Sequence, residues 1–143
     1  MANLELLEQY KAYMEDLGNI GERQSGSRRF YLSVMSALLV FLSASGKGKV
    51  LGEISGEFRI VICIAALCIC ALWFLHLLSF RALFDAKFKV LREMEGEGLP
   101  FHIYKKEWNA LKGDKRYKFF TGFDATVPIL FALIYISIFV LLK

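Results

Sequence analysis

Cysteine and histidine are scarce in this chain of 143 residues, and their scarcity excludes several kinds of site. The three cysteines, Cys63, Cys68 and Cys70, all lie in one apolar stretch. Their Cys-x4-Cys-x-Cys spacing, with no neighbouring histidine, resembles no zinc site. Buried cysteine behaves as a small hydrophobic residue, so we expect these three to pack and to take no part in metal or redox chemistry.

The sequence also lacks the common signatures of catalysis. No G-x-x-x-x-G-K-[ST], H-E-x-x-H or G-x-S-x-G motif occurs. The two histidines, His76 and His102, stand in unlike surroundings, one in an apolar stretch and one in a loop. We therefore expect that the protein is not an enzyme and that it has no catalytic residues, no cofactor and no metal site.

Charge is absent from one long stretch. Ile60 to Phe80 contains no Asp, Glu, Lys or Arg, and as a helix it would reach roughly 31 Å, close to the thickness of a bilayer core. Apolar residues then continue at helical spacing, with charged residues between them. The pattern predicts one long helix, residues 58–94, that spans a membrane and extends several turns into the cytosol.

The overall composition favours a membrane protein over a soluble one. Apolar residues make up 56% and aromatic residues 15%, both high for a soluble domain. A soluble all-helical protein with three very apolar helices is the alternative. The net charge of +4 suggests nucleic acid at first, but the basic residues flank apolar spans, as they do in membrane proteins. No nucleic-acid partner is expected.

Two shorter apolar segments complete a predicted set of three transmembrane helices. Residues 30–46 carry no formal charge, and residues 125–143 are apolar up to the final lysine. Residues 47–57 form a glycine-rich loop of suitable length for a hairpin, expected outside. Arg28-Arg29 and the apolar run that follows them resemble a signal peptide. However, the residues before them form a long acidic amphipathic helix, whereas the n-region of a signal peptide is positively charged. We interpret the segment as a membrane helix.

Residues 1–29 are predicted to form a cytosolic amphipathic helix. Its polar face is acidic, whereas a helix that lies on anionic lipid is rich in lysine. Glycines at positions 18, 21 and 26 allow a bend before the membrane. The apolar stripe should pack on protein, either on this chain's own central helix or on a neighbouring subunit. The residues expected in this packing are Leu7, Tyr10, Met14 and Leu17, with Phe84, Phe88 and Leu91 as partners.

Residues 95–124 form a basic, aromatic cytosolic segment. Two glycines and a proline end the central helix, and a short helix is expected around residues 104–111. Basic residues here and beside the spans are candidates for contacts with lipid head groups. They are Arg28, Arg29, Arg81, Lys105 and Lys106.

The distribution of Lys and Arg predicts the topology. Residues 1–29 carry four, 46–59 three, 81–123 ten, and the C-terminus one. The positive-inside rule therefore favours a cytosolic N-terminus and an outside C-terminus. If the last segment were re-entrant, both termini would be cytosolic.

Two sets of residues within the spans could carry function. Ser33, Ser36 and Ser43 lie on one stripe of the first span, where small hydroxyl residues favour close helix contact. The simpler interpretation is that these serines pack against another helix. The more specific one is that they line an aqueous path in an oligomer. His76, near the cytosolic end of the central span, is a candidate pH-sensitive group, although its polar tip can also reach water.

The order of these segments resembles that of a known family. The chain has EQYKAYMEDLGNIGERQSGSRRF followed by YLSVMSALL, then SFRALFDAKFKVLREME, LPFHIYKKEWNAL and VPILFALIY. It is similar to the RipA family of small octameric bacterial membrane proteins across nearly its whole length. The resemblance implies a bacterial cytoplasmic (inner) membrane location and an assembly of eight subunits, and it implies no catalytic residues.

The sequence thus predicts an all-α, multi-pass membrane protein that forms a homo-oligomeric ring, for which the resemblance implies eight subunits. Such a ring would act as a pore or as a membrane scaffold surrounded by lipids. The alternative is a regulatory or adaptor protein whose cytosolic part binds a soluble partner while lipid fills the centre. The inner face of the ring distinguishes them, because a continuous polar stripe favours a channel and an apolar bore favours a scaffold.

Overall fold

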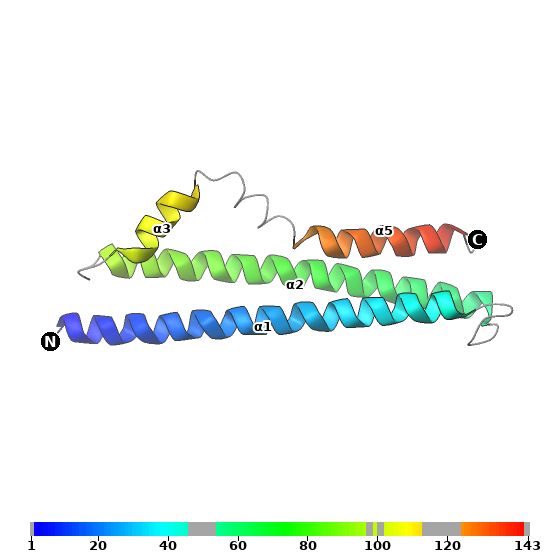
Figure 1. The fold of residues 1–143 in the computed structure, drawn as a ribbon, viewed down its shortest axis with the longest axis horizontal. Helices are drawn as coiled ribbons and strands as arrows, with labels where there is room; N and C mark the ends of the chain where they lie inside the picture. Colours follow the sequence, from blue (N-terminus) through cyan, green and yellow to red (C-terminus); the bar gives the residue numbers. More distant parts are fainter. Residues whose placement is uncertain (1, 46–53, 97–98, 100–101, 113–123, 142–143) are drawn as a thin grey trace. The chain divides into compact units, whose positions relative to one another are not determined.

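The computed structural model describes residues 2–45, 54–96, 99, 102–112 and 124–141, and these contain four helices and no strands. In chain order the helices are α1 (Ala2–Ala44), α2 (Gly56–Gly96), α3 (Ile103–Lys112) and α5 (Thr126–Leu141) (Figure 1). The prediction of an all-α protein is confirmed. The loop predicted at 47–57 lies mostly outside the described residues, as does the greater part of the segment between α3 and α5.

The central helix is slightly longer than predicted. α2 has 41 residues, and it extends two residues beyond the predicted range at each end. The Oγ of Ser55 accepts a hydrogen bond of 3.3 Å from the backbone N–H of Phe58, which caps the first turn. The helix ends at Gly96, the first of the two glycines in the segment predicted to stop it.

The N-terminal helix and the first apolar segment form one continuous helix. α1 runs 43 residues through Gly18, Gly21 and Gly26 without interruption, where the sequence allowed a bend. A Cβ added at any of these glycines would meet no atom of another described segment within 4 Å. Close approach of a neighbouring backbone within the chain therefore does not explain them, and packing on both sides of the glycines holds the helix together.

The helices contribute to two compact units. Residues 1–25 and 78–123 form one, named here the charged unit, and residues 26–77 and 124–143 form the other, the apolar unit. α1 and α2 each supply a segment to both units, whereas α3 belongs to the charged unit and α5 to the apolar unit.

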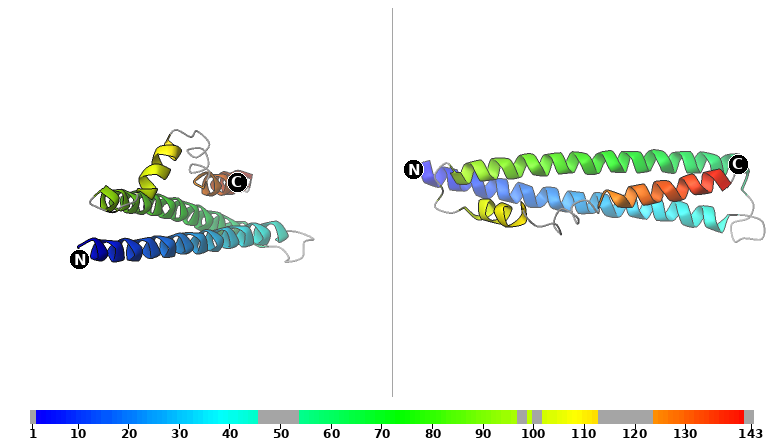
Figure 2. Two further views of the ribbon diagram at one scale, coloured as in Figure 1. Left: turned by 60° about the vertical axis from the view of Figure 1, so that its left-hand side comes forward. Right: turned by 90° about the horizontal axis from the view of Figure 1, so that it is seen from above.

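The apolar unit is a three-helix bundle. α5 lies beside the second half of α1 and the first half of α2 (Figures 1 and 2). Met35 from α1, Trp73 from α2 and Tyr135 from α5 are almost completely buried at its centre. Pro128 lies in the first turn of α5, where proline costs the helix no backbone hydrogen bond.

The charged unit has its own hydrophobic core. Tyr10 and Leu17 from α1 pack with Leu91 from α2, and Leu99 is buried beside them. Leu7, Met14, Phe84 and Phe88 are partly buried against this core. All seven residues named from the sequence as packing partners therefore lie in one cluster, and α1 packs on the chain's own central helix.

The helices differ in whether they are long and apolar enough to cross a membrane. Among the described residues, α2 is the one helix whose length and composition would allow it to cross a membrane. α5 is apolar as well but has only 16 residues, which corresponds to roughly 24 Å.

Candidate functional site

A buried carboxylate organises the charged unit. The side chain of Glu95, in the last turn of α2, is completely buried. Its Oε1 accepts a hydrogen bond of 3.0 Å from the Tyr10 hydroxyl and one of 2.9 Å from the backbone N–H of Tyr104. Its Oε2 accepts one of 3.0 Å from the backbone N–H of Lys105. Since both amides belong to the first turn of α3, Glu95 caps that helix and ties it to α1 and α2.

These hydrogen bonds determine the ionisation of the cluster. Burial by itself would raise the pKa of Glu95, but hydrogen bonds from the backbone of Tyr104 and Lys105 and from the Tyr10 hydroxyl outweigh it and lower the pKa. Burial, the hydrogen bond to Glu95 and the negative charge of Glu95 raise the pKa of Tyr10. At neutral pH the carboxylate is ionised and the Tyr10 hydroxyl is a donor.

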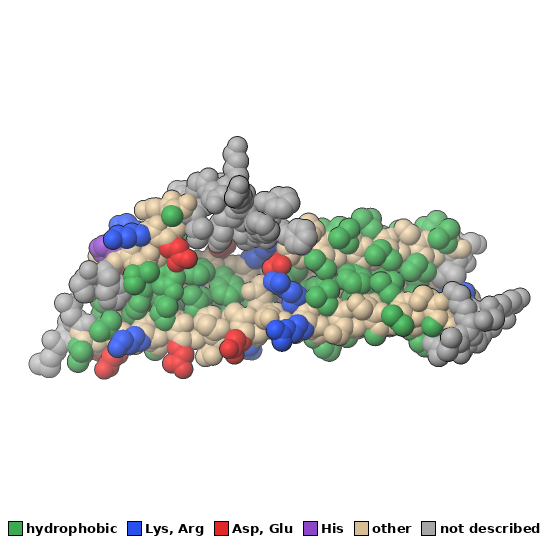
Figure 3. All heavy atoms as spheres, in the orientation of Figure 1, with side chains coloured by type: hydrophobic (Ala, Val, Ile, Leu, Met, Phe, Trp, Pro, Cys, Tyr) green, Lys and Arg blue, Asp and Glu red, His purple; other side chains and the backbone are tan. Residues whose placement is uncertain are grey.

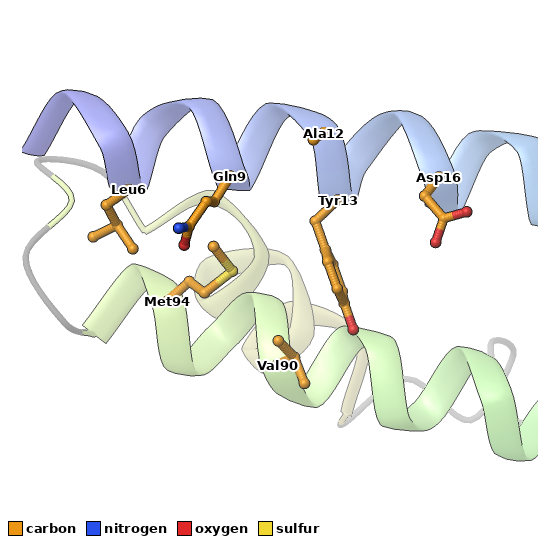
Figure 4. Close-up of a pocket in the computed structure, with 7 residues that line it drawn as sticks. All are labelled: Leu6, Gln9, Ala12, Tyr13, Asp16, Val90 and Met94. Atoms are coloured by element: carbon orange, nitrogen blue, oxygen red, sulfur yellow. The ribbon is translucent and has the colours of Figure 1, made fainter.

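A groove opens between α1 and α2 in the same unit. It is lined by Leu6, Gln9, Ala12, Tyr13 and Asp16 from α1 and by Val90 and Met94 from α2 (Figure 4). The Asp16 carboxylate accepts a hydrogen bond from the Lys87 ammonium. That ammonium also lies 4.3 Å from the centre of the Tyr13 ring. The charge of Asp16 is thereby balanced within the chain.

The short helix α3 has one face engaged and one face exposed. The Tyr104 ring lies 5.7 Å from the Phe88 ring, and the Arg92 guanidinium lies 4.5 Å from the centre of the Trp108 ring. Lys105 and Lys106, the two candidate lipid contacts in this helix, are exposed.

The outward faces of the apolar unit are not alike. On α1 the three serines named from the sequence, Ser33, Ser36 and Ser43, are exposed, and Ser43 donates a hydrogen bond of 2.9 Å to the Val40 carbonyl of its own helix. On α2 and α5 most of the exposed residues are large and aliphatic, although Ala65, Cys68, Ala71 and Ser137 are exposed as well. The large aliphatic residues include Val61, Ile64, Leu72, Leu75, Ile129, Leu130, Leu133 and Ile136. Hydrophobic side chains cover much of the surface seen in Figure 3. The face of α1 differs in that it exposes three serines among its apolar residues.

His76 belongs to an aromatic cluster within the apolar unit. The Tyr31 ring stacks on the Trp73 indole, with 5.5 Å between centroids and 8° between planes, and its edge approaches the His76 ring at 6.0 Å. His76 is partly buried there. The structure thus places His76 of α2 against Tyr31 of α1, and the sequence offered no sign of this aromatic neighbour.

Two further polar contacts hold the apolar unit together. The Tyr135 hydroxyl of α5 donates a buried hydrogen bond of 2.8 Å to the Met35 carbonyl of α1. Arg28 forms a 2.7 Å salt bridge with Asp124, just before α5. Arg28 is therefore engaged within the chain, whereas Arg29 is exposed and Arg81 is partly buried.

Sequence reasoning did not find Glu95, Tyr10 or Tyr135 as hydrogen-bonding residues. Glu95 falls in the segment predicted to end the central helix, Tyr10 on the predicted packing stripe, and Tyr135 in the third apolar segment. One signal was available, because a tyrosine on a buried stripe needs a partner for its hydroxyl. The identity of that partner depends on tertiary packing, since Tyr10 and Glu95 are separated by 85 positions.

Comparison with known proteins agrees with this architecture. A family model described as the octameric membrane protein family (8xMP) matches residues 7–142, almost the whole chain. Neither the curated proteins nor the solved structures contained a match to the sequence. The family match confirms the resemblance seen in the residues, and the chain belongs to the octameric membrane protein family.

Proposed function

We propose that this protein is a homo-octameric scaffold of the bacterial cytoplasmic membrane, with lipid around the ring and within it. The observation that carries the proposal is the difference between the outward faces of the apolar unit. Large aliphatic side chains on α2 and α5 suit contact with lipid, whereas the small residues Ser33, Ser36 and Ser43 on α1 suit contact with another helix. Because the family is octameric, the helix that meets this face would belong to a second copy.

The proposed topology has three spans, formed by residues 30–44 of α1, 60–80 of α2 and 126–141 of α5. The described residues in these ranges include no Asp, Glu, Lys or Arg. The excess of Lys and Arg in residues 1–29 and 81–123 supports a cytosolic charged unit. In this arrangement the N-terminus is cytosolic and the C-terminus is outside.

Cysteine labelling in intact cells tests this topology. A membrane-impermeant maleimide should label Glu57→Cys and Leu141→Cys directly, and Glu8→Cys only after lysis, with the wild-type chain as the background control. Labelling of Leu141→Cys only after lysis would instead show that α5 is re-entrant. Direct labelling of Glu8→Cys would reverse the orientation.

The exposed face of α1 is only partly polar, and this favours a scaffold over a channel. Exposed Phe30 and Val40 lie on either side of Ser33 and Ser36, and the Ser43 hydroxyl already donates a hydrogen bond within its own helix. Such a face offers no continuous polar path for ions. We therefore propose that the ring organises lipid or presents its charged unit to a soluble partner, and that it carries no catalytic activity.

Ion flux through liposomes that contain the pure oligomer tests this choice. The scaffold proposal expects no flux above that of empty liposomes at any pH or voltage. The second candidate function is a pore, which the exposed hydroxyls of Ser33 and Ser36 favour. Steady flux that is reduced by Ser33→Leu or Ser36→Leu, in an oligomer of unchanged mass, would establish the pore and overturn the scaffold.

A further inference from the structure

The groove of the charged unit is an apolar surface with an acidic border. Leu6, Ala12 and Tyr13 line it from α1, and Val90 and Met94 line it from α2 (Figure 4). Leu83, 41% exposed, lies seven residues before Val90 and therefore on the same face of α2. The groove thus continues along α2 as a line of apolar residues.

The charge inside the groove is paired within the chain, and further carboxylates are exposed beside it. Asp16 pairs with Lys87, whose side chain is only 14% exposed. On the outer side of α1, the exposed carboxylates Glu5, Glu8 and Glu15 are spaced three and seven residues apart, which places them on one face of the helix. An occupant of the groove would therefore meet apolar side chains at the centre and negative charge along the α1 edge.

The exposed face of α3 has the complementary chemistry. Ile103 is 59% exposed, and Lys106 and Ala110, at the i+3 and i+7 positions, are exposed on the same face. This face has an apolar anchor with a positive charge, Lys106, on one side of it and a negative charge, the exposed Glu107, on the other. The Lys106 side can therefore meet the acidic face of α1 while Glu107 points away from it. The opposite side of α3 is held on its own subunit by the contact of Tyr104 with Phe88, so the two faces of α3 have different partners.

The groove and the α3 contact occupy different faces of α2. Val90 and Met94 line the groove, whereas Phe88 and Arg92 contact α3. At 100° per residue these two pairs lie on opposite sides of the helix. Each charged unit can therefore accept a helix on one side of α2 while it presents its own α3 on the other.

We propose that the groove of each subunit binds the exposed face of α3 from a second copy of this chain, with Ile103 seated among Leu6, Val90 and Met94. Lys106 then lies beside the acidic face of α1. A ring closes through contacts between two different surfaces of each subunit, and the groove and α3 are two such surfaces. This interface rests on the proposed homo-octamer, and it assigns to that assembly the surfaces that meet.

Disulfide cross-linking of the full-length chain in detergent tests the interface. The double variant Gln9→Cys/Lys106→Cys should, on oxidation, give a ladder of covalent species that rises in steps of one subunit up to eight. Each single variant should give no ladder, because one subunit's groove meets the next subunit's α3. Mixed single variants should stop at dimers. Gln9→Cys/Lys89→Cys is the matched control, since Lys89 is exposed on α2 away from both surfaces, and no ladder is expected from it.

Native mass spectrometry of the same samples distinguishes failure of the interface from failure of the octamer. An octameric mass with no ladder from Gln9→Cys/Lys106→Cys overturns the interface alone and leaves the groove to lipid or a soluble partner. A monomeric wild-type chain overturns both. Charge reversal gives a second measurement: Lys106→Glu should lower the octamer fraction at least several-fold, and Glu8→Lys in the same chain should restore it. An unchanged octamer fraction in Lys106→Glu contradicts the proposed charge contact.

Discussion

The Tyr10 hydroxyl donates a hydrogen bond of 3.0 Å to the buried carboxylate of Glu95, 85 residues further along the chain. This bond joins the first helix to the end of the second. The same carboxylate accepts the backbone amides of Tyr104 and Lys105. One side chain thus determines where α3 starts and how it is held, and α3 carries the surface proposed to meet the next subunit.

Removal of the Tyr10 hydroxyl should destabilise the charged unit. Tyr10→Phe keeps the ring in the core but removes one donor from an ionised, buried acceptor, and we expect a loss of about 1.5 to 3 kcal/mol in the free energy of unfolding. Urea unfolding followed by Trp fluorescence measures it. Tyr13→Phe is the control, because the Tyr13 ring remains available to the Lys87 ammonium. Equal stability of Tyr10→Phe and wild type would contradict the role given to this bond.

The stability of the charged unit should fall in acid because of Glu95. Its hydrogen bonds lower the pKa of Glu95 below its ordinary value of 4.5. A lowered pKa in the folded state means that the stabilisation is complete above the unfolded pKa and is lost as the pH falls through the folded pKa. Glu95→Gln cannot titrate and should be less stable than wild type at pH 7.

The difference in unfolding free energy between wild type and Glu95→Gln should therefore narrow as the pH is lowered below 4.5. Urea unfolding at a series of pH values measures it for both chains. A difference that stays constant from neutral to acid pH would show that the charge of Glu95 contributes nothing to the fold.

The sequence predicted the helices much better than it predicted the polar contacts between them. Apolar periodicity, with the glycines and the proline that follow it, placed α2 to within two residues at each end. Periodicity also placed Leu7, Tyr10 and Phe88 in one packed cluster. The continuity of α1 was missed because glycines at 18, 21 and 26 indicate weak helix locally, while packing on α2 at both ends overrides them. The contacts Tyr10–Glu95 and Tyr135–Met35 bridge positions far apart in the chain, so no local pattern contains them.

The bond between Tyr135 and Met35 should contribute modestly to the apolar unit. Tyr135→Phe removes a donor to a backbone carbonyl, and interhelical hydrogen bonds in membranes are worth about 0.6 to 1.7 kcal/mol. Thermal unfolding in detergent should show a small decrease in midpoint. Tyr31→Phe, which retains stacking on Trp73, serves as the control. A decrease as large for Tyr31→Phe as for Tyr135→Phe would contradict the hydrogen bond as the cause.

The salt bridge between Arg28 and Asp124 should matter little for stability. Both side chains are partly exposed, at 46% and 32%, and exposed ion pairs contribute about 0 to 1 kcal/mol. A double-mutant cycle with Arg28→Gln and Asp124→Asn in detergent measures the coupling. A coupling energy well above this range would show that the pair is far less accessible to water in the assembly than in the single chain.

The central claim is that this chain assembles through itself into a ring of eight, and the mass of the complex extracted from the membrane tests it most directly. Native mass spectrometry of the purified protein in detergent should give eight times the chain mass of 16.3 kDa. A complex of one or two chains, under conditions that keep α1 and α2 folded, would contradict the ring and with it the proposed contact between α3 and the groove.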